Sequence, residues 1–411
     1  MIDTISTGIN KSKKKPRAAF VIHRFASKIQ QEVIGGAEFL AYQTAKHMAK
    51  YWDIEILTTC AKDYISWENE YPEGIEETET FCIRRFKVDC RRNLKLCNTL
   101  WEYIFNNAHT LEDEVKFLVA QGPYSSRLLS YIEKNKSNYD FFILFTATYC
   151  TTLFSMQLVP EKSFLVPTAE NTPLIRLEVM RKLFNTPKGI IYLTEAEKRL
   201  IHRVHHNENV PNIITGIGID FSNTINPDAF RKKFNLRRSS DNFAVYIGRV
   251  DSEKGCNLLF KYFEKYNNEE KNNLKLVVVG PEILKVPRLN NVLYLGVLSE
   301  EDKFNCLGAA KFLLQPSPYE SLSIVLLEAW WAEKPAVVNG ACEVTVEQCK
   351  KANAGLWFDS YEEFKGAINY LLSNEEVASK MGKSGKKYVT ENYSWEKIEK
   401  KYLEFVTPYV I

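Results

Sequence analysis

The sequence predicts an α/β protein built from two doubly wound domains that face each other across a cleft. Short runs of β-branched and aromatic residues alternate with longer stretches of helical periodicity along most of the chain. This alternation is typical of parallel sheets with right-handed crossover connections. It stops and begins again after Pro211, and 411 residues are enough for two such domains. We therefore expect an N-terminal domain of residues 1–210 and a C-terminal domain of residues 211–394.

The first series of elements opens with a strand over residues 17–23 and a helix over residues 36–49. Residues 67–125 interrupt the alternation, because they are rich in Glu, Arg, Asn and aromatic side chains, and we interpret them as a helical insertion. The remaining strands expected in this domain are residues 54–59, 141–145, 163–166 and 189–193.

The second series begins with residues 212–220, a strand that runs into a glycine-containing loop. We expect the last helix, within residues 395–411, to pack back on the N-terminal domain. The other strands expected here are residues 243–247, 274–279, 292–295, 311–315 and 336–339.

Composition is that of a soluble globular protein, with 45% hydrophobic and 26% charged residues. The net charge of +3 is too small to indicate a nucleic-acid partner. Nine cysteines without a Cys-x-x-Cys pair indicate core positions in a reducing compartment. Neither a signal peptide nor a run of membrane-spanning length is visible, so we expect a cytoplasmic protein.

Two basic segments could make peripheral contact with the inner face of the cell membrane. They are residues 11–17 near the N-terminus and the basic and aromatic stretch of residues 91–105. A solvated terminus and the packing of an inserted helix are the simpler interpretations of the same two segments.

The candidate functional residues follow the expected strands of the second series. Gly248 to Gly255 directly follows one strand and carries Arg249 and Lys254 beside a helix start. Helix amides and paired cations both favour dense negative charge, so this segment could bind a diphosphate. A solvated charged turn is the alternative interpretation. Gly280 and the run from Pro316 to Glu320 follow two other strands, so three loops would converge on one edge of the cleft.

Glu320 and Glu328 are two carboxylates that lie eight positions apart, one in a loop and one inside an apolar helical run. A charge among such neighbours costs free energy unless it has a partner, although Glu328 could also be a surface position on an amphipathic helix. In the first domain, Gly35 and Gly36 open a helix after a strand and would let the backbone approach a phosphate or sugar. A flexible loop is the other explanation for that pair.

These pieces together resemble a retaining family-4 glycosyltransferase of the GT-B fold, a family also called glycosyl transferases group 1. The resemblance covers nearly the whole chain and depends on the order and spacing of the motifs. It implies two Rossmann-like domains, a C-terminal helix that returns to the N-terminal domain, and a nucleotide-diphosphate sugar as donor without any further cofactor. The matching segments are Gly35–Glu38, Ile217–Asp220, Tyr246–Gly255, Val278–Gly280 and the pair of Glu320 and Glu328.

The resemblance also implies roles for individual residues. Arg249 and Lys254 would neutralise the diphosphate, Glu328 would accept hydrogen bonds from the ribose, and Glu320 would lie near the transferred sugar. The implied donor-binding positions are Gly35, Gly36, Gly218, Gly248, Arg249, Lys254, Gly280, Glu320, Ser321, Leu322, Ser323 and Glu328.

One position departs from the family pattern. Relatives carry a histidine in the N-terminal domain that approaches the transferred sugar, and the matching residue here is Glu170. Glu170 could replace the histidine as a hydrogen-bond partner, so we include it with Glu320, Arg249 and Lys254 as catalytic candidates. The chain has no Asp-x-Asp triplet, so we expect no metal site, and Arg249 and Lys254 would supply the positive charge instead.

The leading hypothesis is therefore a metal-independent, retaining glycosyltransferase for surface polysaccharide biosynthesis. It would move a sugar from a nucleotide-diphosphate donor to a saccharide or a lipid-linked saccharide. The rival hypothesis is a catalytically degenerate protein that binds a nucleotide sugar or a partner without turnover, which the missing histidine favours. A sugar-nucleotide epimerase of the same fold is a third class, but its acid and base residues are not evident in the sequence.

Overall fold

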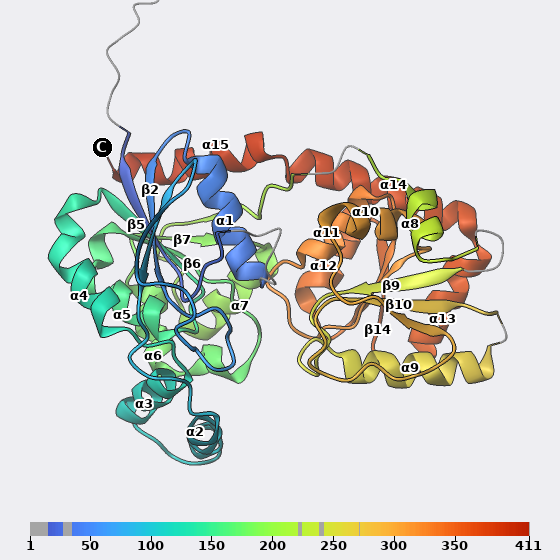
Figure 1. The fold of residues 1–411 in the computed structure, drawn as a ribbon, viewed down its shortest axis with the longest axis horizontal. Coiled ribbons are helices and arrows are strands. Elements are labelled where there is room, and N and C mark those ends of the chain that lie inside the picture. Colours follow the sequence, from blue (N-terminus) through green and yellow to red (C-terminus); the bar gives the residue numbers. More distant parts are fainter. Residues whose placement is uncertain (1–14, 28–34, 221–223, 238–241, 271, 411) are drawn as a thin grey trace, which may run out of the picture.

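The computed structural model describes residues 15–27, 35–220, 224–237, 242–270 and 272–410, which form two α/β domains side by side (Figure 1). This is the two-domain α/β architecture that the sequence predicts. Each domain is built around one sheet, with helices on both of its faces.

In the described part of the N-terminal domain, eight strands form a sheet in the order β3-β4-β2-β1-β5-β6-β7-β8. All recorded pairs are parallel except β3 with β4. The strands are β1 (Arg17–Val21), β2 (Asp53–Thr59), β3 (Gly74–Glu77), β4 (Cys82–Phe86), β5 (Phe141–Phe145), β6 (Ser163–Val166), β7 (Gly189–Tyr192) and β8 (Asn212–Ile214). The helices are α1 (Gly36–Met48), α2 (Leu94–Asn106), α3 (Leu111–Gln121), α4 (Ser126–Asn135), α5 (Cys150–Leu158), α6 (Glu178–Asn185) and α7 (Glu195–His205).

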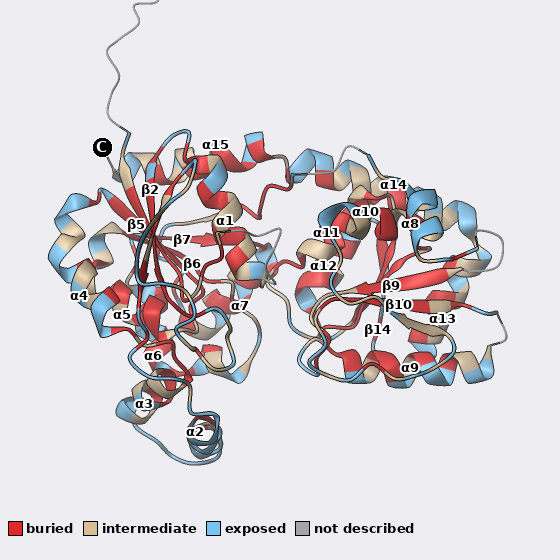
Figure 2. Cartoon of the chain, in the orientation of Figure 1, coloured by how far each residue is buried: buried red, intermediate tan, exposed pale blue. Residues whose placement is uncertain are grey.

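Both faces of the central strands of this sheet are buried, as the colouring of Figure 2 shows, whereas the edge strands β3 and β8 are more exposed. Along β1, Ala18 and Phe20 belong to one hydrophobic cluster, while Ala19 and Val21 belong to the cluster on the opposite face. Successive side chains of a strand point to opposite faces, so a strand covered by helices on both sides reads as a continuous apolar run. This is why the sequence revealed the central strands.

The expected helical insertion at residues 67–125 is wrong in its first part, because β3 and β4 lie there and extend the sheet. Arg84 and Arg85 interrupt the apolar pattern of β4. Arg84 pairs with Glu55 of β2 at 2.6 Å and Arg85 with Glu76 of β3 at 3.1 Å, so ion pairs hold charged residues inside the sheet. The later part is helical, and α2 and α3 project from one end of the domain (Figure 1).

The domain boundary predicted at residues 210 and 211 also needs correction. β8 pairs with β7 from Asn212 to Ile214, so these residues complete the first sheet. The connection to the second domain therefore begins after Ile214.

In the described part of the C-terminal domain, six parallel strands lie in the order β11-β10-β9-β12-β13-β14. They are β9 (Phe243–Ile247), β10 (Lys275–Val279), β11 (Val292–Tyr294), β12 (Leu313–Gln315), β13 (Ala336–Asn339) and β14 (Gly355–Phe358). The helices are α8 (Pro227–Lys233), α9 (Cys256–Glu269), α10 (Glu300–Ala309), α11 (Ile324–Trp331), α12 (Glu343–Ala352), α13 (Tyr361–Ser373) and α14 (Glu375–Asn392).

The last helix, α15 (Trp395–Val406), returns to the N-terminal domain as predicted (Figure 1). Tyr402 packs edge-on against Trp52, and Phe405 against Phe164 of β6. Trp395 stacks on His47 of α1, with 3.8 Å between the ring centroids. These aromatic contacts join the end of the chain to the first sheet.

Candidate functional site

The loops at the carboxyl ends of β9, β10 and β12 touch one another, which is the convergence that the sequence predicts. At Gly280, which follows β10, a Cβ atom would lie 1.9 Å from the carbonyl oxygen of Gly248, which follows β9. At Gly255 a Cβ would lie 2.3 Å from the carbonyl oxygen of Pro316, which follows β12. Both glycines also have positive φ, +134° and +75°. Only glycine allows both this close approach of another backbone and a positive φ. These close approaches bring the three loops together into one surface.

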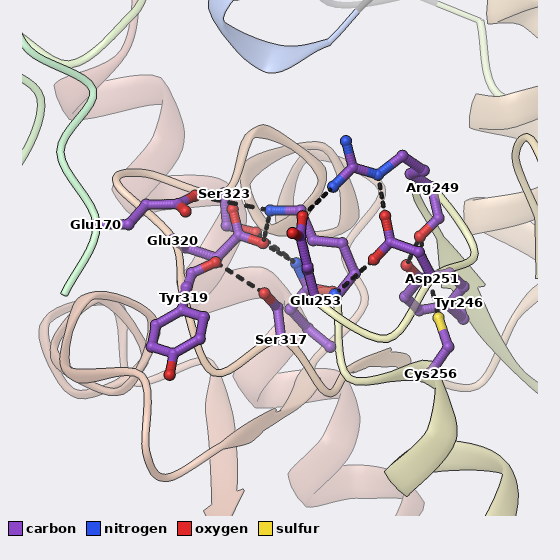
Figure 3. A network of polar contacts seen from close by, with 12 residues as sticks. Glu170, Tyr246, Arg249, Asp251, Glu253, Cys256, Ser317, Tyr319, Glu320 and Ser323 are labelled. Carbon is purple, nitrogen blue, oxygen red and sulfur yellow. Dashed lines mark hydrogen bonds and ion pairs between the residues drawn. The ribbon is translucent and has the colours of Figure 1, made fainter. Parts of the chain in front are cut away.

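Lys254 lies at the centre of this surface. Its Nζ is 2.9 Å from Oε1 of Glu320 and 3.8 Å from Oε1 of Glu170, which reaches in from the N-terminal domain (Figure 3). Burial lowers the pKa of Lys254, but the two carboxylates outweigh it and the net shift is upward. The structure therefore brings together three of the four predicted catalytic residues around one fixed positive charge.

Glu170 lies in the loop after β6, and 36% of its side chain is exposed. Burial raises its pKa to about 7. Lys254 acts against this shift, while the neighbouring carboxylates of Glu320 and Glu253 add to it. A carboxyl group with this pKa can exchange a proton near neutral pH, which is a common property of residues in active sites.

Glu320 is held from a second side by Gln315, a residue that the sequence analysis missed. Gln315 ends β12, and its Nε2 donates to Oε1 of Glu320 at 3.2 Å and to Oγ of Ser323 at 3.1 Å. Ser323 has a φ of +65°, so the loop enters α11 through a left-handed turn. A polar side chain at the carboxyl end of a buried strand was the available signal for Gln315.

The peptide groups of the loop between Glu320 and Ser323 have a defined orientation. The Ser321 carbonyl accepts a hydrogen bond from Oγ1 of Thr194 in the N-terminal domain at 3.2 Å, and the Leu322 carbonyl accepts one from Gln348. Because a trans peptide holds its N–H opposite its C=O, the amides of Leu322 and Ser323 point away from these two partners. Their predicted role as donors to a sugar or phosphate remains a prediction.

Arg249 lies beside Lys254, Glu320 and Glu170, and carboxylates of its own loop compensate its positive charge (Figure 3). It pairs with Asp251 and, at 2.9 Å, with Oε2 of Glu253. The guanidinium also lies 4.8 Å from the centre of the ring of Tyr64, a residue of the N-terminal domain. The backbone amide of Lys254 donates to the other carboxylate oxygen of Asp251 at 2.7 Å. Asp251 thus fixes both predicted diphosphate ligands relative to each other.

Glu328 is buried in α11 and is only 5% exposed, so the alternative of a surface position is wrong. Nζ of Lys303 in α10 lies 2.7 Å from its Oε1 and 2.8 Å from Oε1 of Glu300. Glu328 therefore has the partner that a buried charge requires. Lys303 is a second residue that the sequence analysis missed.

The C-terminal domain matches a known protein family. Residues 228–388 match the family described as Glycosyl transferases group 1. The part of the chain that is similar to this family therefore lies in the C-terminal domain. The match contains Arg249, Lys254, Glu320 and Glu328 together with the loops that position them.

Solved structures show that the whole chain has the GT-B fold of such transferases. Sucrose-phosphate synthase from Thermosynechococcus elongatus is 14% identical, covers 96% of this chain and 99% of its own, and has a TM-score of 0.69. HepE of Anabaena in complex with UDP and glucose is 14% identical, with coverage of 95% and 99% and a TM-score of 0.67. WaaG, a glycosyltransferase involved in lipopolysaccharide biosynthesis, is 16% identical, with coverage of 94% and 99% and a TM-score of 0.65.

Curated relatives match over part of their length. An uncharacterized glycosyltransferase of Methanocaldococcus jannaschii is 27% identical over 200 residues, 43% of this chain and 50% of the relative. An O-antigen chain mannosyltransferase of Escherichia coli is 25% identical over 182 residues, 41% of this chain and 47% of the relative. An alpha-1,3/1,6-mannosyltransferase of Dictyostelium discoideum is 28% identical over 241 residues, 55% of this chain and 56% of the relative. The chain thus spans about half the length of the curated relatives it matches.

The predicted glycines outside residues 228–388 pack against neighbours that explain part of their pattern. A Cβ at Gly35 would lie 2.5 Å from the carboxylate of Glu38. A Cβ at Gly36 would meet no other atom within 4 Å. The loop before Gly35 lies outside the described residues. Gly218 lies in the connection between the domains, where a Cβ would lie 2.2 Å from the indole of Trp395. Packing against Trp395 explains the need for glycine there, and the donor-binding role of these three glycines stays a prediction.

A buried carboxylate supports the loop that carries Glu170. Glu197 of α7 is fully buried, and its Oε1 and Oε2 each accept a hydrogen bond at 2.6 Å, from the amides of Ala169 and Leu193. Burial raises the pKa of Glu197 to about 8, against the lowering effect of these amides. The sequence analysis missed this residue, although Thr194 and Glu197 have the spacing of a helix capping box. That motif would have been interpreted only as the start of a helix.

We predict that Glu197→Ala destabilises the protein by about 2–5 kcal/mol, because it leaves two buried amides unpaired. Urea denaturation at pH 7 measures the loss. Glu195→Ala is the matched control, since Glu195 is an exposed carboxylate in the same helical turn and its loss should change stability by less than about 0.5 kcal/mol. Equal effects of the two substitutions would show that Glu197 does not support the loop.

Proposed function

We propose that the protein is a retaining glycosyltransferase that moves a sugar from a nucleotide-diphosphate donor to a saccharide or lipid-linked saccharide. The observation that carries the proposal is the Lys254 ammonium, shared by Glu320 of one domain and Glu170 of the other. It lies at the carboxyl ends of parallel strands, where open α/β sheets bind their ligands.

Lys254 and Arg249 would bind the donor's diphosphate and neutralise the charge that develops on it as the leaving group departs. In the structure both cations are compensated by carboxylates, Lys254 by Glu320 and Glu170, and Arg249 by Asp251 and Glu253. A diphosphate would compete for the two cations and take their place in these pairs. Fixed positive groups of this kind lower a barrier by about 3–4 kcal/mol each, so a metal ion is not required.

The configuration at the anomeric carbon is retained if the acceptor attacks, and the diphosphate departs, on the same face of the sugar. The bond from the anomeric carbon to the leaving phosphate oxygen breaks, a bond to the acceptor oxygen forms, and the acceptor's proton passes to the leaving phosphate. Glu320 and Glu170 then hold the sugar from opposite domains, while the amides of Leu322 and Ser323 hold its phosphate.

A role in surface polysaccharide biosynthesis is supported by the names of relatives, which include an O-antigen chain mannosyltransferase and a lipopolysaccharide glycosyltransferase. We infer a cytoplasmic enzyme that works at the inner face of the cell membrane on saccharide or lipid-linked acceptors. Among the described residues, no helix is both long and apolar enough to cross a membrane.

A thermal-shift screen with UDP, GDP, ADP, dTDP and CMP, each with and without EDTA, tests the donor site. We expect one nucleoside diphosphate to stabilise the protein, by about 2.7 kcal/mol at a hundred times its dissociation constant, and EDTA to leave the shift unchanged. Loss of the shift with EDTA would overturn metal independence.

Turnover separates this proposal from its rival. Incubation with the corresponding nucleotide sugars should release the free nucleoside diphosphate, faster when an acceptor is present. Stabilisation without any release would identify a degenerate protein that binds a nucleotide sugar, which the replacement of the usual histidine by Glu170 would explain. If no nucleotide stabilises the protein and no nucleoside diphosphate is released, the proposed donor site is wrong.

A further inference from the structure

Lys303 is positioned to control the charge of the buried carboxylate in α11. Glu328 lies between Leu327 and Ala329, both fully buried. The ammonium of Lys303 lies between this carboxylate, at 2.7 Å, and Glu300, at 2.8 Å. Only 14% of the Lys303 side chain is exposed, whereas Glu300 is 58% exposed. Lys303 thus connects an exposed carboxylate to a buried one.

Other elements packed on α11 do not bring a second cation to Glu328 in the described part of the chain. β12 and β13 contain no charged residue. On α14, Lys386 bonds to Glu333 beyond the end of α11, at 2.8 Å. The charged groups that act on Glu328 are therefore Lys303 and Glu300, both from α10.

Glu328 is buried and Lys303 is largely buried, and each one favours the charged form of the other. Burial raises the pKa of Glu328, Lys303 lowers it, Glu300 raises it, and the net shift is upward. Burial lowers the pKa of Lys303, and Glu328 and Glu300 more than reverse that effect. Without Lys303, the burial of Glu328 would act with no opposing cation, so the carboxyl would hold its proton to a higher pH.

We propose that Lys303 is a positioning residue for the nucleotide: it keeps Glu328 ionised and fixed, so that this carboxylate can accept hydrogen bonds from the ribose hydroxyls of a nucleoside diphosphate. A carboxylate offers about four acceptor positions, so Glu328 can keep its bond to Lys303 and still bind two hydroxyls. This inference rests on the proposed function, because it takes Glu328 as the ribose ligand.

Isothermal titration calorimetry from pH 6 to pH 9 tests the inference. The probe is whichever of UDP, GDP and ADP binds the wild type most tightly, together with its 2′-deoxy counterpart. Every variant is compared with the wild type at the same pH, so that titration of the terminal phosphate cancels. We expect Lys303→Met to bind the ribonucleotide at least tenfold more weakly near pH 6.5 and to recover as the pH rises and Glu328 ionises. Its preference for the ribose form over the deoxy form should shrink at the same low pH.

Control variants separate positioning from a structural role. Lys303→Arg keeps the cation and should bind within a few-fold of the wild type, and Lys386→Met removes a lysine that pairs outside the site and should bind normally. Glu328→Gln should bind weakly at every pH, and adding Lys303→Met to it should cost nothing more. If Lys303→Met does not fold, Lys303→Gln replaces it, and its folding is checked by its melting temperature.

The possible failures are distinguishable. If the wild type binds none of the three nucleotides, the proposed function fails. If the wild type binds and Lys303→Met loses affinity equally at all pH values and for both sugars, Lys303 has only a structural role and the inference is overturned. Unchanged affinity in Lys303→Met overturns it as well.

Discussion

Lys254→Ala is expected to lower the rate of sugar transfer by about 10²–10³-fold, the effect of removing one preorganised group that stabilises charge in a transition state. The reason is the position of its ammonium, 2.9 Å from Glu320 and 3.8 Å from Glu170, at the junction of both domains. A diphosphate bound there would lose its most buried cation. Steady-state kinetics with the donor sugar identified by the nucleotide screen measures the change.

The same substitution should change stability much less. Lys254 is 27% exposed, Glu170 36% and Glu320 11%, so water can reach Glu170 once the ammonium is removed. We expect the free energy of unfolding to fall by about 1–2 kcal/mol, less than for a fully buried ion pair. Lys261→Ala, on the exposed face of α9, is the control and should affect neither quantity. Activity of Lys254→Ala within a few-fold of the wild type would show that the diphosphate site is elsewhere.

The sequence was most informative where a functional residue follows directly after a buried strand. Arg249 and Lys254 come just after β9 and Glu320 just after β12, so strand periodicity and the glycine turns were enough to place them at one edge of a sheet. Glu170 follows β6 in the same way, and its match to the family's histidine position was the reason to group it with these residues; the structure places it 3.8 Å from Lys254.

Partners from distant segments could not be predicted in this way. Lys303 comes from a helix 25 positions before Glu328, and Glu197 comes from a helix 28 positions after its partner Ala169, with no pattern that links either pair. β4 was missed for a related reason, because Arg84 and Arg85 look like surface residues until their acidic partners on β2 and β3 are known. Local periodicity records which face of an element is buried, but not which charge on another element compensates a buried one.

Glu170→Gln is expected to remove a pH dependence from both folding and donor binding. The pKa of Glu170 in the folded protein is raised from 4.5 to about 7. A raised carboxyl pKa favours folding while the group is protonated, and this benefit is lost as the pH rises from about 4.5 through 7. Relative to the wild type, Glu170→Gln should therefore gain thermal stability across that interval and keep a constant advantage above it. Melting temperatures from pH 4 to pH 9 measure the difference, with Glu161→Gln, at an exposed carboxylate beside β6, as control.

Donor binding should respond to the same group in a defined direction. When a diphosphate takes the Lys254 ammonium, Glu170 loses its opposing cation and gains a dianionic neighbour, so its pKa should rise further. The wild type should then take up a proton on binding at pH 7–8, and its affinity for the donor should fall as the pH increases. A nucleotide sugar is the right probe, because it has no terminal phosphate that titrates near pH 6.

Calorimetry in two buffers of different ionisation enthalpy measures this proton directly. At pH 8, where Glu170 is mostly ionised before binding, we expect uptake approaching one proton in the wild type and in Glu161→Gln, and close to none in Glu170→Gln. An uptake that persists in Glu170→Gln would assign the proton to another group. Binding without any uptake in the wild type would mean that Lys254 remains with Glu170 when the donor binds, and the diphosphate would then have to be neutralised by Arg249 alone. The same titration therefore decides which of the two cations faces the leaving group.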